Sequence, residues 1–459
     1  MNKVPLFIIA LLCSLTLKSV AQATIVGYAP QFCGKKFFLW KEEDFLSKKR
    51  AVIKDTIVNS KGIFRFTVAS GPIQKYFIGN NDLFGYLYVQ DGGKYKIEFI
   101  SEKSQDKTYN LREEIELTFI DLDSTDINYK ILGYESWLDD ILSQIHFEKN
   151  NDDELWSKIT YLKYAILKDV QQDTSSFFRN YVWYSIAMNI DNLRYKGARS
   201  QKDNFETYFQ NRPILYSNTS YCQYFESFFD QFVTRMQVED ASSFFQAVVD
   251  LNIAAQDQII KKYSYTSDDP LRSLIALYIL KQAAGANLIP KSIIISNLSL
   301  RNTSSPIETH RKLANNLLLK LSKLSVGDVF PFDRIKIKPT DGKYVYIHAF
   351  NTSNTQCIQE LNALIKLKLR YGSTIEFLTV YVDKPLNSVT EKKAFESISW
   401  TKVGLKEDDP LWEQLGIFTF PYYLLIDKDF VLLASPALTP TPNGKYETIE
   451  KTFFELSKP

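Results

Sequence analysis

The side chains of this sequence that could do thiol chemistry are those of four cysteines, Cys13, Cys33, Cys222 and Cys357. Cys13 lies in an apolar N-terminal segment, so the rest of the chain keeps three thiols, an odd number that forms no complete disulfide framework. We expect these three thiols to be buried and inert. One disulfide with one free thiol is the alternative, and spacing alone does not choose the pair.

Other catalytic groups are sparse. The three histidines, His146, His310 and His348, stand in no HExxH motif and in no pairing with cysteine at metal-ligand spacing. The sequence also contains no GxSxG motif and no phosphate-binding glycine loop. We therefore expect no metal and no cofactor, and we expect the histidines to be structural.

Length and charge bound the class of protein. With 459 residues, the chain is long enough for about three domains. Its 55 basic and 53 acidic residues nearly balance, which argues against a nucleic-acid partner and against a polybasic membrane-surface segment. The hydrophobic fraction of 45% is that of a protein with sizeable cores.

The first residues have the pattern of a secretory signal peptide. Lys3 supplies a positive charge, residues 4–17 form a mostly apolar run, and Ala21-Gln22-Ala23 is a small-x-small cleavage site. The run is shorter than the ~20 residues that a membrane-spanning helix needs. We expect residues 1–23 to be removed and an exported protein to begin near Thr24. Lipidation at Cys13 is disfavoured because bulky Leu12 precedes it.

Three sequence patterns follow one another along the rest of the chain. Residues 24–120 alternate with period two, as in "GIFRFTV" and "KYKIEFI", and short turns separate the runs. This pattern predicts an antiparallel β-sandwich. In residues 121–323 apolar side chains recur every three to four positions, as at Trp137, Ile141 and Ile145, which predicts an all-helical domain. Asp269-Pro270 is a helix start there.

Residues 324–459 predict an α/β domain. The strand in "KYVYIHAF" is followed by a helical run and then by "STIEFLTVYVDK", which suits a buried parallel strand. "FPYYLLIDKDFVLL" reads as a hairpin, and a closing helix follows. Strand, helix, strand, hairpin and helix predict a mixed sheet, so the whole chain is a multidomain α+β protein.

Four motifs give residues 324–459 a resemblance. "VGDVFPF", "VYIHAFNTSNTQCIQEL", "LWEQLGIF" and "FPYYLLIDKDF" are similar to the entry, active-site, pre-proline and cis-proline motifs of exported thioredoxin-like, peroxiredoxin-related proteins of Gram-negative bacteria. "SKGIFRF" also resembles a hairpin of the small β-domain that precedes such modules. The resemblance implies a thioredoxin fold and a location in the periplasm or cell envelope.

The same resemblance implies an altered active site. "VYIHAFNTSNTQCIQEL" aligns without a gap to the family segment that carries CxxC, and Cys357 is then the second cysteine. Asn354 replaces the first cysteine, Glu360 matches a family glutamate, and Pro421 matches the cis proline beside the site. We expect Asn354 and Pro421 to be degenerate active-site positions.

The loss of the first thiol decides the expected function. A cysteine at a helix N-terminus has a stabilised thiolate that attacks disulfides, and asparagine cannot attack. Asparagine is a good N-cap, so Asn354 keeps the helix start while Cys357 becomes a buried filler. The protein is then a non-catalytic binding or scaffold protein, whose partner is an exported protein or peptide.

Two other functions stay open. A divergent thiol–disulfide oxidoreductase would use Cys357, which must then be exposed and acidic or lie beside Cys33 or Cys222. An envelope protein could instead contact glycan or peptide through the aromatic-rich sandwich. The sequence gives no oligomeric state.

Overall fold

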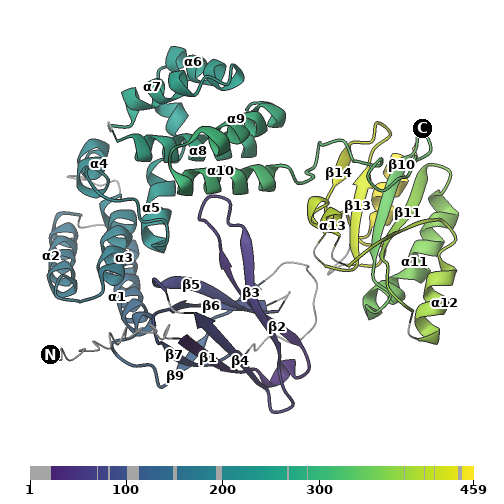
Figure 1. Cartoon of the computed structure of the whole chain (residues 1–459), viewed down its shortest axis with the longest axis horizontal. Coiled ribbons are helices and arrows are strands. Elements are labelled where there is room, and N and C mark those ends of the chain that lie inside the picture. Colours follow the sequence, from purple (N-terminus) through teal and green to yellow (C-terminus); the bar gives the residue numbers. More distant parts are fainter. Residues whose placement is uncertain are drawn as a thin grey trace, which may run out of the picture.

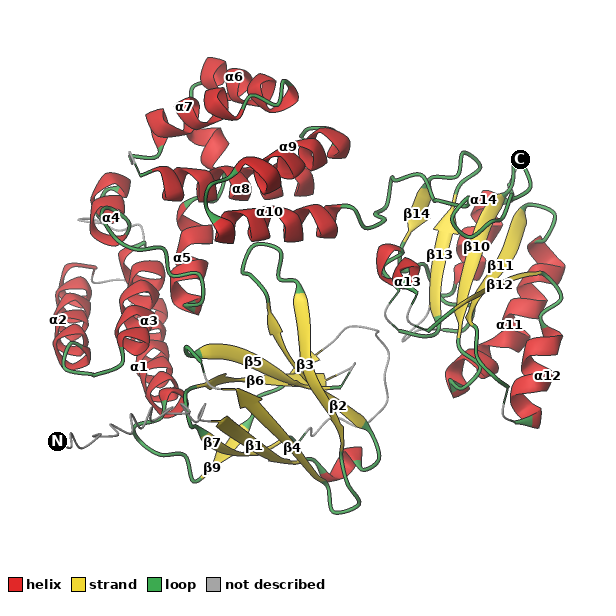
Figure 2. Cartoon of the chain, viewed as in Figure 1, coloured by secondary structure: helices red, strands yellow, loops and turns green. Residues whose placement is uncertain are grey.

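The computed structural model describes residues 22–69, 71–80, 83–100, 113–147, 152–192, 199–265, 268–286, 288–386, 388–407, 409–417, 419–442 and 447–458. The predicted signal peptide, Cys13 included, lies outside these residues except for Gln22 and Ala23. Two sheets come first in the chain, helices follow, and a third sheet ends it (Figures 1 and 2). Within the described residues, no helix combines the length and the apolar composition that crossing a membrane requires.

The first two sheets pack into a sandwich. One sheet has the order β4 (Ile63–Ala69), β1 (Gln22–Tyr28), β7 (Lys94–Glu98) and β9 (Thr118–Ile120). The other has the order β3 (Arg50–Ile57), β2 (Lys36–Glu42), β5 (Gln74–Gly79), β6 (Leu83–Val89) and β8 (Glu113–Glu114). Phe64, Phe66 and Val68 point into the shared core and Arg65 points outward, as the period-two pattern predicts.

The predicted sandwich is observed, but it is not antiparallel throughout. β1 pairs with β7 in parallel, and β6 pairs with β8 in parallel. After β4 the chain builds β5 and β6 in the other sheet and returns as β7 alongside β1, in the direction of β1. Alternation reports only which face of a strand is buried, so it does not reveal the direction of a neighbouring strand.

The first strand also begins earlier than Thr24. β1 starts at Gln22, and Ala23 is fully buried opposite Val68 of β4. The small residues that suit a cleavage site also suit a tightly packed strand, so composition did not separate the two roles.

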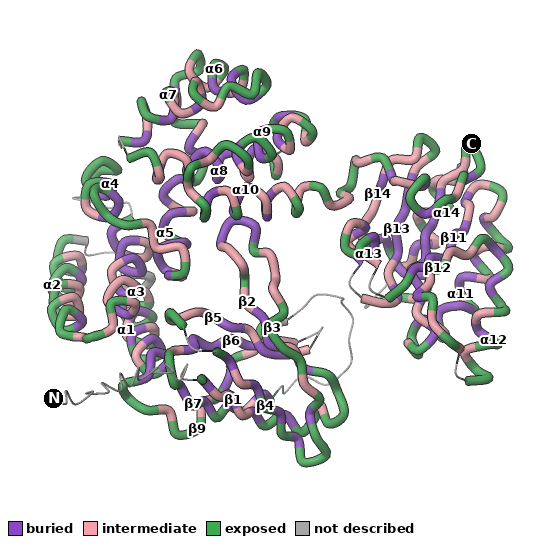
Figure 3. The backbone as a smooth tube through the Cα atoms, viewed as in Figure 1, coloured by how far each residue is buried: buried purple, intermediate pink, exposed green. Residues whose placement is uncertain are grey.

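Ten α-helices are described between the sandwich and the third sheet. They are α1 (Ile127–Phe147), α2 (Asp152–Val170), α3 (Ser176–Ile186), α4 (Gln201–Tyr208), α5 (Thr219–Phe228), α6 (Val238–Val249), α7 (Ile253–Tyr263), α8 (Asp269–Gly285), α9 (Lys291–Ser304) and α10 (Glu308–Leu321). α8 begins at the predicted Asp269-Pro270 and is buried along most of its length, because helices surround it (Figure 3).

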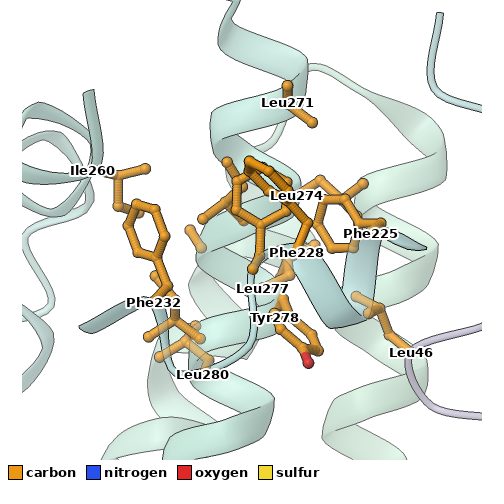
Figure 4. Packing of buried hydrophobic residues seen from close by; sticks show 14 of the residues in the cluster. Leu46, Phe225, Phe228, Phe232, Ile260, Leu271, Leu274, Leu277, Tyr278 and Leu280 are labelled. Atoms are coloured by element: carbon orange, nitrogen blue, oxygen red, sulfur yellow. The ribbon is translucent and has the colours of Figure 1, made fainter. Parts of the chain in front are cut away.

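A hairpin joins the sandwich to the helices. Between β2 and β3 the chain leaves its sheet as a hairpin that reaches the helices (Figure 1). Phe45 and Leu46 at its tip belong to the core of the helices, and Figure 4 shows Leu46 there. The ring of Phe45 lies edge-on to Phe225 of α5, with 5.7 Å between centroids. On α10, Lys320 donates from Nζ to the backbone carbonyl of Ser47 over 2.9 Å. The hairpin tip therefore packs into the core of the helices, while the sandwich keeps a core of its own.

The third sheet is mixed, as predicted. Its order is β12 (Thr401–Leu405), β11 (Ile375–Val382), β10 (Tyr344–Phe350), β13 (Tyr422–Ile426) and β14 (Leu432–Ala434). The first three strands are parallel to one another, while β13 and β14 form the predicted hairpin. The helices are α11 (Thr355–Tyr371), α12 (Val389–Ser397), α13 (Pro410–Gln414) and α14 (Ile449–Leu456).

This third region stands beside the helices at the end of a connecting segment after α10 (Figure 1). Lys291 of α9 reaches that segment and pairs with Asp328. The predicted domain boundaries, at residues 23, 120 and 323, stay predictions.

Candidate functional site

The candidate site lies where α11 begins. β10 ends at Phe350, a polar turn follows, and Asn354 has the extended backbone of an N-cap. Its Oδ1 accepts a hydrogen bond from the N–H of Cys357 over 3.2 Å. The predicted N-cap is therefore confirmed, and it satisfies one of the N–H groups that a helix leaves open at its start.

The amide of Asn354 makes a second bond, to the segment before β13. Its Nδ2 donates to the backbone carbonyl of Phe420 over 2.8 Å. The next peptide bond, Phe420–Pro421, is cis. The structure thus brings Asn354 and Pro421 together, as the resemblance implied, and both hydrogen-bonding ends of the Asn354 side chain are occupied.

Cys357 lies one turn inside α11 and has no exposed surface. It packs with Phe350 and Leu361 in the core between the sheet and α11. Burial raises the pKa of the Cys357 thiol to about 12, because the core cannot solvate a thiolate. The expectation of a buried filler is confirmed, and the exposed, acidic Cys357 that the oxidoreductase alternative needs is not observed.

Next to this thiol lies a buried carboxyl group that the resemblance pointed out. Glu360 is 3% exposed and accepts hydrogen bonds from the hydroxyl of Tyr423, from Gln356 over 3.1 Å and from Thr441 over 3.3 Å. Sequence reasoning missed Tyr423. The signal was available, since Tyr423 belongs to the apolar strand that follows the cis proline.

Tyr423 is also the middle of a stack of rings. The rings of Tyr346 and His348, both on β10, each stack on the ring of Tyr423. The centroid distance is 5.2 Å in both pairs, and the interplanar angles are 8° for Tyr346 and 11° for His348. His348 is 1% exposed, and neither of its ring nitrogens has a hydrogen-bond partner in the structure as described. Burial lowers the pKa of His348 to about 3, so the ring is neutral and structural.

The other two thiols do not complete the site. Cys222 is buried in the core of the helices and Cys357 in that of the third sheet, and the three described cysteines are all free. Cys33 is exposed, which corrects the expectation of three buried thiols. It follows a short 3-10 turn between β1 and β2, outside the alternating strand pattern that carries side chains into the core.

A metal centre is not found either. No group of three or more His, Cys, Asp or Glu side chains that could hold an ion occurs among the residues that the structure describes. At the start of α11 the structure brings together the side-chain amide of Asn354, the cis proline Pro421 and the buried thiol of Cys357.

Comparison with known proteins gives matches to solved structures alone. No family model matches the chain, and neither does any curated protein. The chain is similar to the thioredoxin domain of a thiol-disulfide oxidoreductase from Bacteroides vulgatus, at 23% identity and a TM-score of 0.21 over 25% of this chain and 90% of that one.

Two further solved structures resemble the chain in the same way. A thiol:disulfide interchange protein from Bacteroides sp. is 21% identical, with a TM-score of 0.23, over 29% of this chain and 90% of that one. A thiol-disulfide oxidoreductase from Bacteroides fragilis is 15% identical, with a TM-score of 0.23, over 29% of this chain and 99% of that one. These matches cover little more than a quarter of the chain.

Proposed function

We propose that residues 324–459 are a thioredoxin-like module that has lost its nucleophilic thiol and serves as a binding or scaffold part of an exported envelope protein. One observation carries this proposal. At the N-terminus of α11, where an attacking thiol would sit, the side chain of Asn354 is bound at both ends, to the N–H of Cys357 and to the carbonyl of Phe420.

The chemistry of the remaining thiol supports the same proposal. Disulfide exchange starts from a thiolate that reaches its target. With a pKa of about 12, Cys357 would be a thiolate in only about one molecule in 10⁵ at pH 7, and it has no exposed surface. Reduction of peroxides needs the same exposed thiolate, so it is disfavoured for the same reason.

The surface around the site suits a partner better than a reaction. Ser353 and Thr355 are exposed on either side of Asn354, and the buried cis proline follows Phe420, whose carbonyl accepts from Asn354. The two exposed hydroxyl groups are what this surface offers to an extended chain. The partner is then an exported protein or a peptide, held without covalent chemistry.

The test is the reduction of insulin with dithiothreitol as electron donor. We expect the wild type to match the uncatalysed rate. Asn354→Cys should add activity, because it restores two thiols three residues apart with the new one at the helix N-terminus. Cys222→Ser is the matched control for loss of a buried thiol. Wild-type activity that disappears in Cys357→Ser but persists in Cys222→Ser would instead establish the divergent oxidoreductase.

Export is part of the proposal, and β1 sharpens where processing would occur. Cleavage after Ala23 would remove a fully buried residue of β1. Cleavage after Ala21, at Ser19-Val20-Ala21, also satisfies the small-x-small rule and leaves β1 whole. N-terminal sequencing of the protein from a Gram-negative periplasm should give Gln22. A start at Thr24 would contradict this assignment.

A further inference from the structure

A second site is suggested by a cleft of about 960 Å³ between the sandwich and the helices. We call it the inter-region cleft. Its floor is β5 with Lys75 and Phe77, one wall is the hairpin between β2 and β3, and the opposite wall is formed by the starts of α3 and α5. Figure 1 shows these four elements converging on one side of the hairpin. This volume is at the upper end of ordinary ligand pockets.

Unpaired charges line the cleft. The ammonium group of Lys75 lies 3.4 Å from the ring centroid of Tyr86 and makes no hydrogen bond or ion pair with any described residue. Burial lowers the pKa of Lys75, against the opposing fields of Glu114 and Glu42. Both carboxylates line the cleft, and neither has a hydrogen-bond or ion-pair partner in the described part of the chain.

The protein around Glu42 also acts on this carboxyl group. Loss of water raises the pKa of Glu42, while Lys48 and Lys75 oppose that rise. Glu42 is exposed, whereas Lys75 is partly buried, and an unpaired charge in that position is unfavourable unless something binds it. A ligand that donates to Glu42 and Glu114 and accepts from Lys75 would give these charges the partners that they lack.

The wall opposite the hairpin carries the partial positive charge of two helix N-termini, those of α3 and α5. Ser175 and Asn218 cap α3 and α5, and their side chains accept from the N–H groups of Phe178 and Tyr221. The N–H of Thr219, in the first turn of α5, keeps no partner among the described residues. Two helix N-termini on one wall of a cavity favour a negative charge or carbonyl oxygens there.

The chemistry of the two walls selects the occupant. A peptide carries positive groups, carbonyl oxygens and a terminal carboxylate on one short chain. Three of the five carboxylates that line the cleft already have partners: Glu43 pairs with Lys49, Glu226 pairs with Lys281, and Asp44 accepts from Ser47 and Asn316. Glu42 and Glu114 are left to accept the cationic groups of a ligand. We propose that the inter-region cleft binds a short basic peptide, with its cationic groups at Glu42 and Glu114 and its carboxylate at the starts of α3 and α5.

This site is separate from the start of α11. Glu42 lies on the sandwich and the helix starts lie in the helical region, whereas Asn354 and Pro421 belong to the third sheet region. The cleft can therefore bind its peptide whether or not the proposed role of the thioredoxin-like module holds.

The test is calorimetric titration of the full chain with pentalysine, with free termini, at low salt. We expect binding that weakens as salt is added, because the attraction between charges is screened. The double variant Glu42→Gln, Glu114→Gln should bind at least ten-fold more weakly. Glu239→Gln, an exposed change on α6 outside the cleft, is the matched control and should bind as the wild type does. Amidated pentalysine should also bind more weakly, since it lacks the carboxylate.

Three results would overturn the proposal. They are equal affinity for pentalysine in the double variant, tighter binding of pentaglutamate than of pentalysine, and binding of maltoheptaose that the double variant loses, which would assign the cleft to carbohydrate. Asn354→Ala should leave pentalysine binding unchanged, so failure at one site is distinguishable from failure at the other. Circular dichroism of each variant checks that it is folded.

Discussion

The N-termini of α5 and α11 have the same local construction in two unrelated regions of the molecule. Asn218 begins one helix and Asn354 the other, and each side-chain oxygen accepts from the N–H three residues later. Each amide nitrogen then donates to a carbonyl of another segment, that of Phe177 for α5 and that of Phe420 for α11. Each asparagine caps its helix and fixes it to a neighbouring part of the fold.

Both helices also bury a thiol close to that start. Cys222 is four residues beyond Asn218, Cys357 is three beyond Asn354, and burial raises the pKa of both thiols. No thiol-pair motif marks α5 in the sequence, so its arrangement is structural. Since α11 repeats it, Asn354 and Cys357 need no reactivity to explain them. What differs is the spacing, because only at α11 would cysteine in place of asparagine create a CxxC pair.

The largest contrast should be in thiol reactivity. We expect exposed Cys33 to react with iodoacetamide at pH 8 about 10³-fold faster than Cys357, because a pKa of about 12 leaves little thiolate and burial excludes the reagent. Cys222 should be as slow as Cys357. Peptide mass spectrometry after timed quenching gives the rates, and in guanidinium all three should react alike. A fast Cys357 beside a slow Cys222 would break the comparison.

The two regions also bury one histidine each, with different surroundings. His310 contacts Tyr216 over 2.7 Å and Ser273 over 3.1 Å, whereas His348 has no such partner. Burial lowers the pKa of His310 to about 4 and that of His348 to about 3. Because the unfolded chain binds a proton near pH 6.5, each histidine removes stability as pH falls from about 6.5 toward its folded pKa.

Between pH 7 and pH 5 each buried histidine should lower the free energy of unfolding by about 2 kcal/mol. His348→Phe keeps a ring against Tyr423 and should reduce that loss in the third sheet region, measured by urea unfolding at the two pH values. His310→Phe is the matched variant for the helices. An unchanged pH dependence in His348→Phe would show that this histidine is already protonated or hydrated in the fold.

The two asparagine caps should contribute equally to the free energy of unfolding. Asn354→Ala and Asn218→Ala each remove a cap and a tie to another segment, so each should lower the free energy of unfolding by about 1 to 2 kcal/mol. Urea unfolding followed by fluorescence and circular dichroism gives both values. A much smaller loss for Asn354→Ala than for Asn218→Ala would indicate that the α11 position is kept for a partner and not for the fold.

The smallest expected change comes from Asn354→Asp. Aspartate still caps the helix, and its charge suits the helix N-terminus, but it cannot donate to the carbonyl of Phe420. We expect a loss below about 1 kcal/mol. Asn218→Asp, measured in the same way, should behave alike, since Asn218 makes the equivalent bond to Phe177. A gain in stability would mean that the donated bond contributes little.

Local features of this molecule could be read from the sequence, and distant ones could not. The cap at Asn354, the hairpin of β13 and β14 and the buried alternation at Phe64 and Phe66 follow from residues close in sequence. The parallel pairing of β1 with β7 depends on how the chain crosses between sheets. The inter-region cleft likewise forms only when segments more than 170 residues apart meet, such as those of Glu42 and Asn218.

The hairpin between β2 and β3 sets an order of events in biosynthesis. Asn316 of α10 donates to Asp44 across a separation of 272 residues, and Phe45 and Leu46 are buried only among the helices. At a synthesis rate of about 5 to 20 residues per second, the hairpin waits roughly 15 to 55 s for its partners on α10 to emerge. Until then its apolar tip is incompletely covered. A chaperone that binds exposed apolar loops would therefore bind this hairpin mainly before α10 has been synthesised.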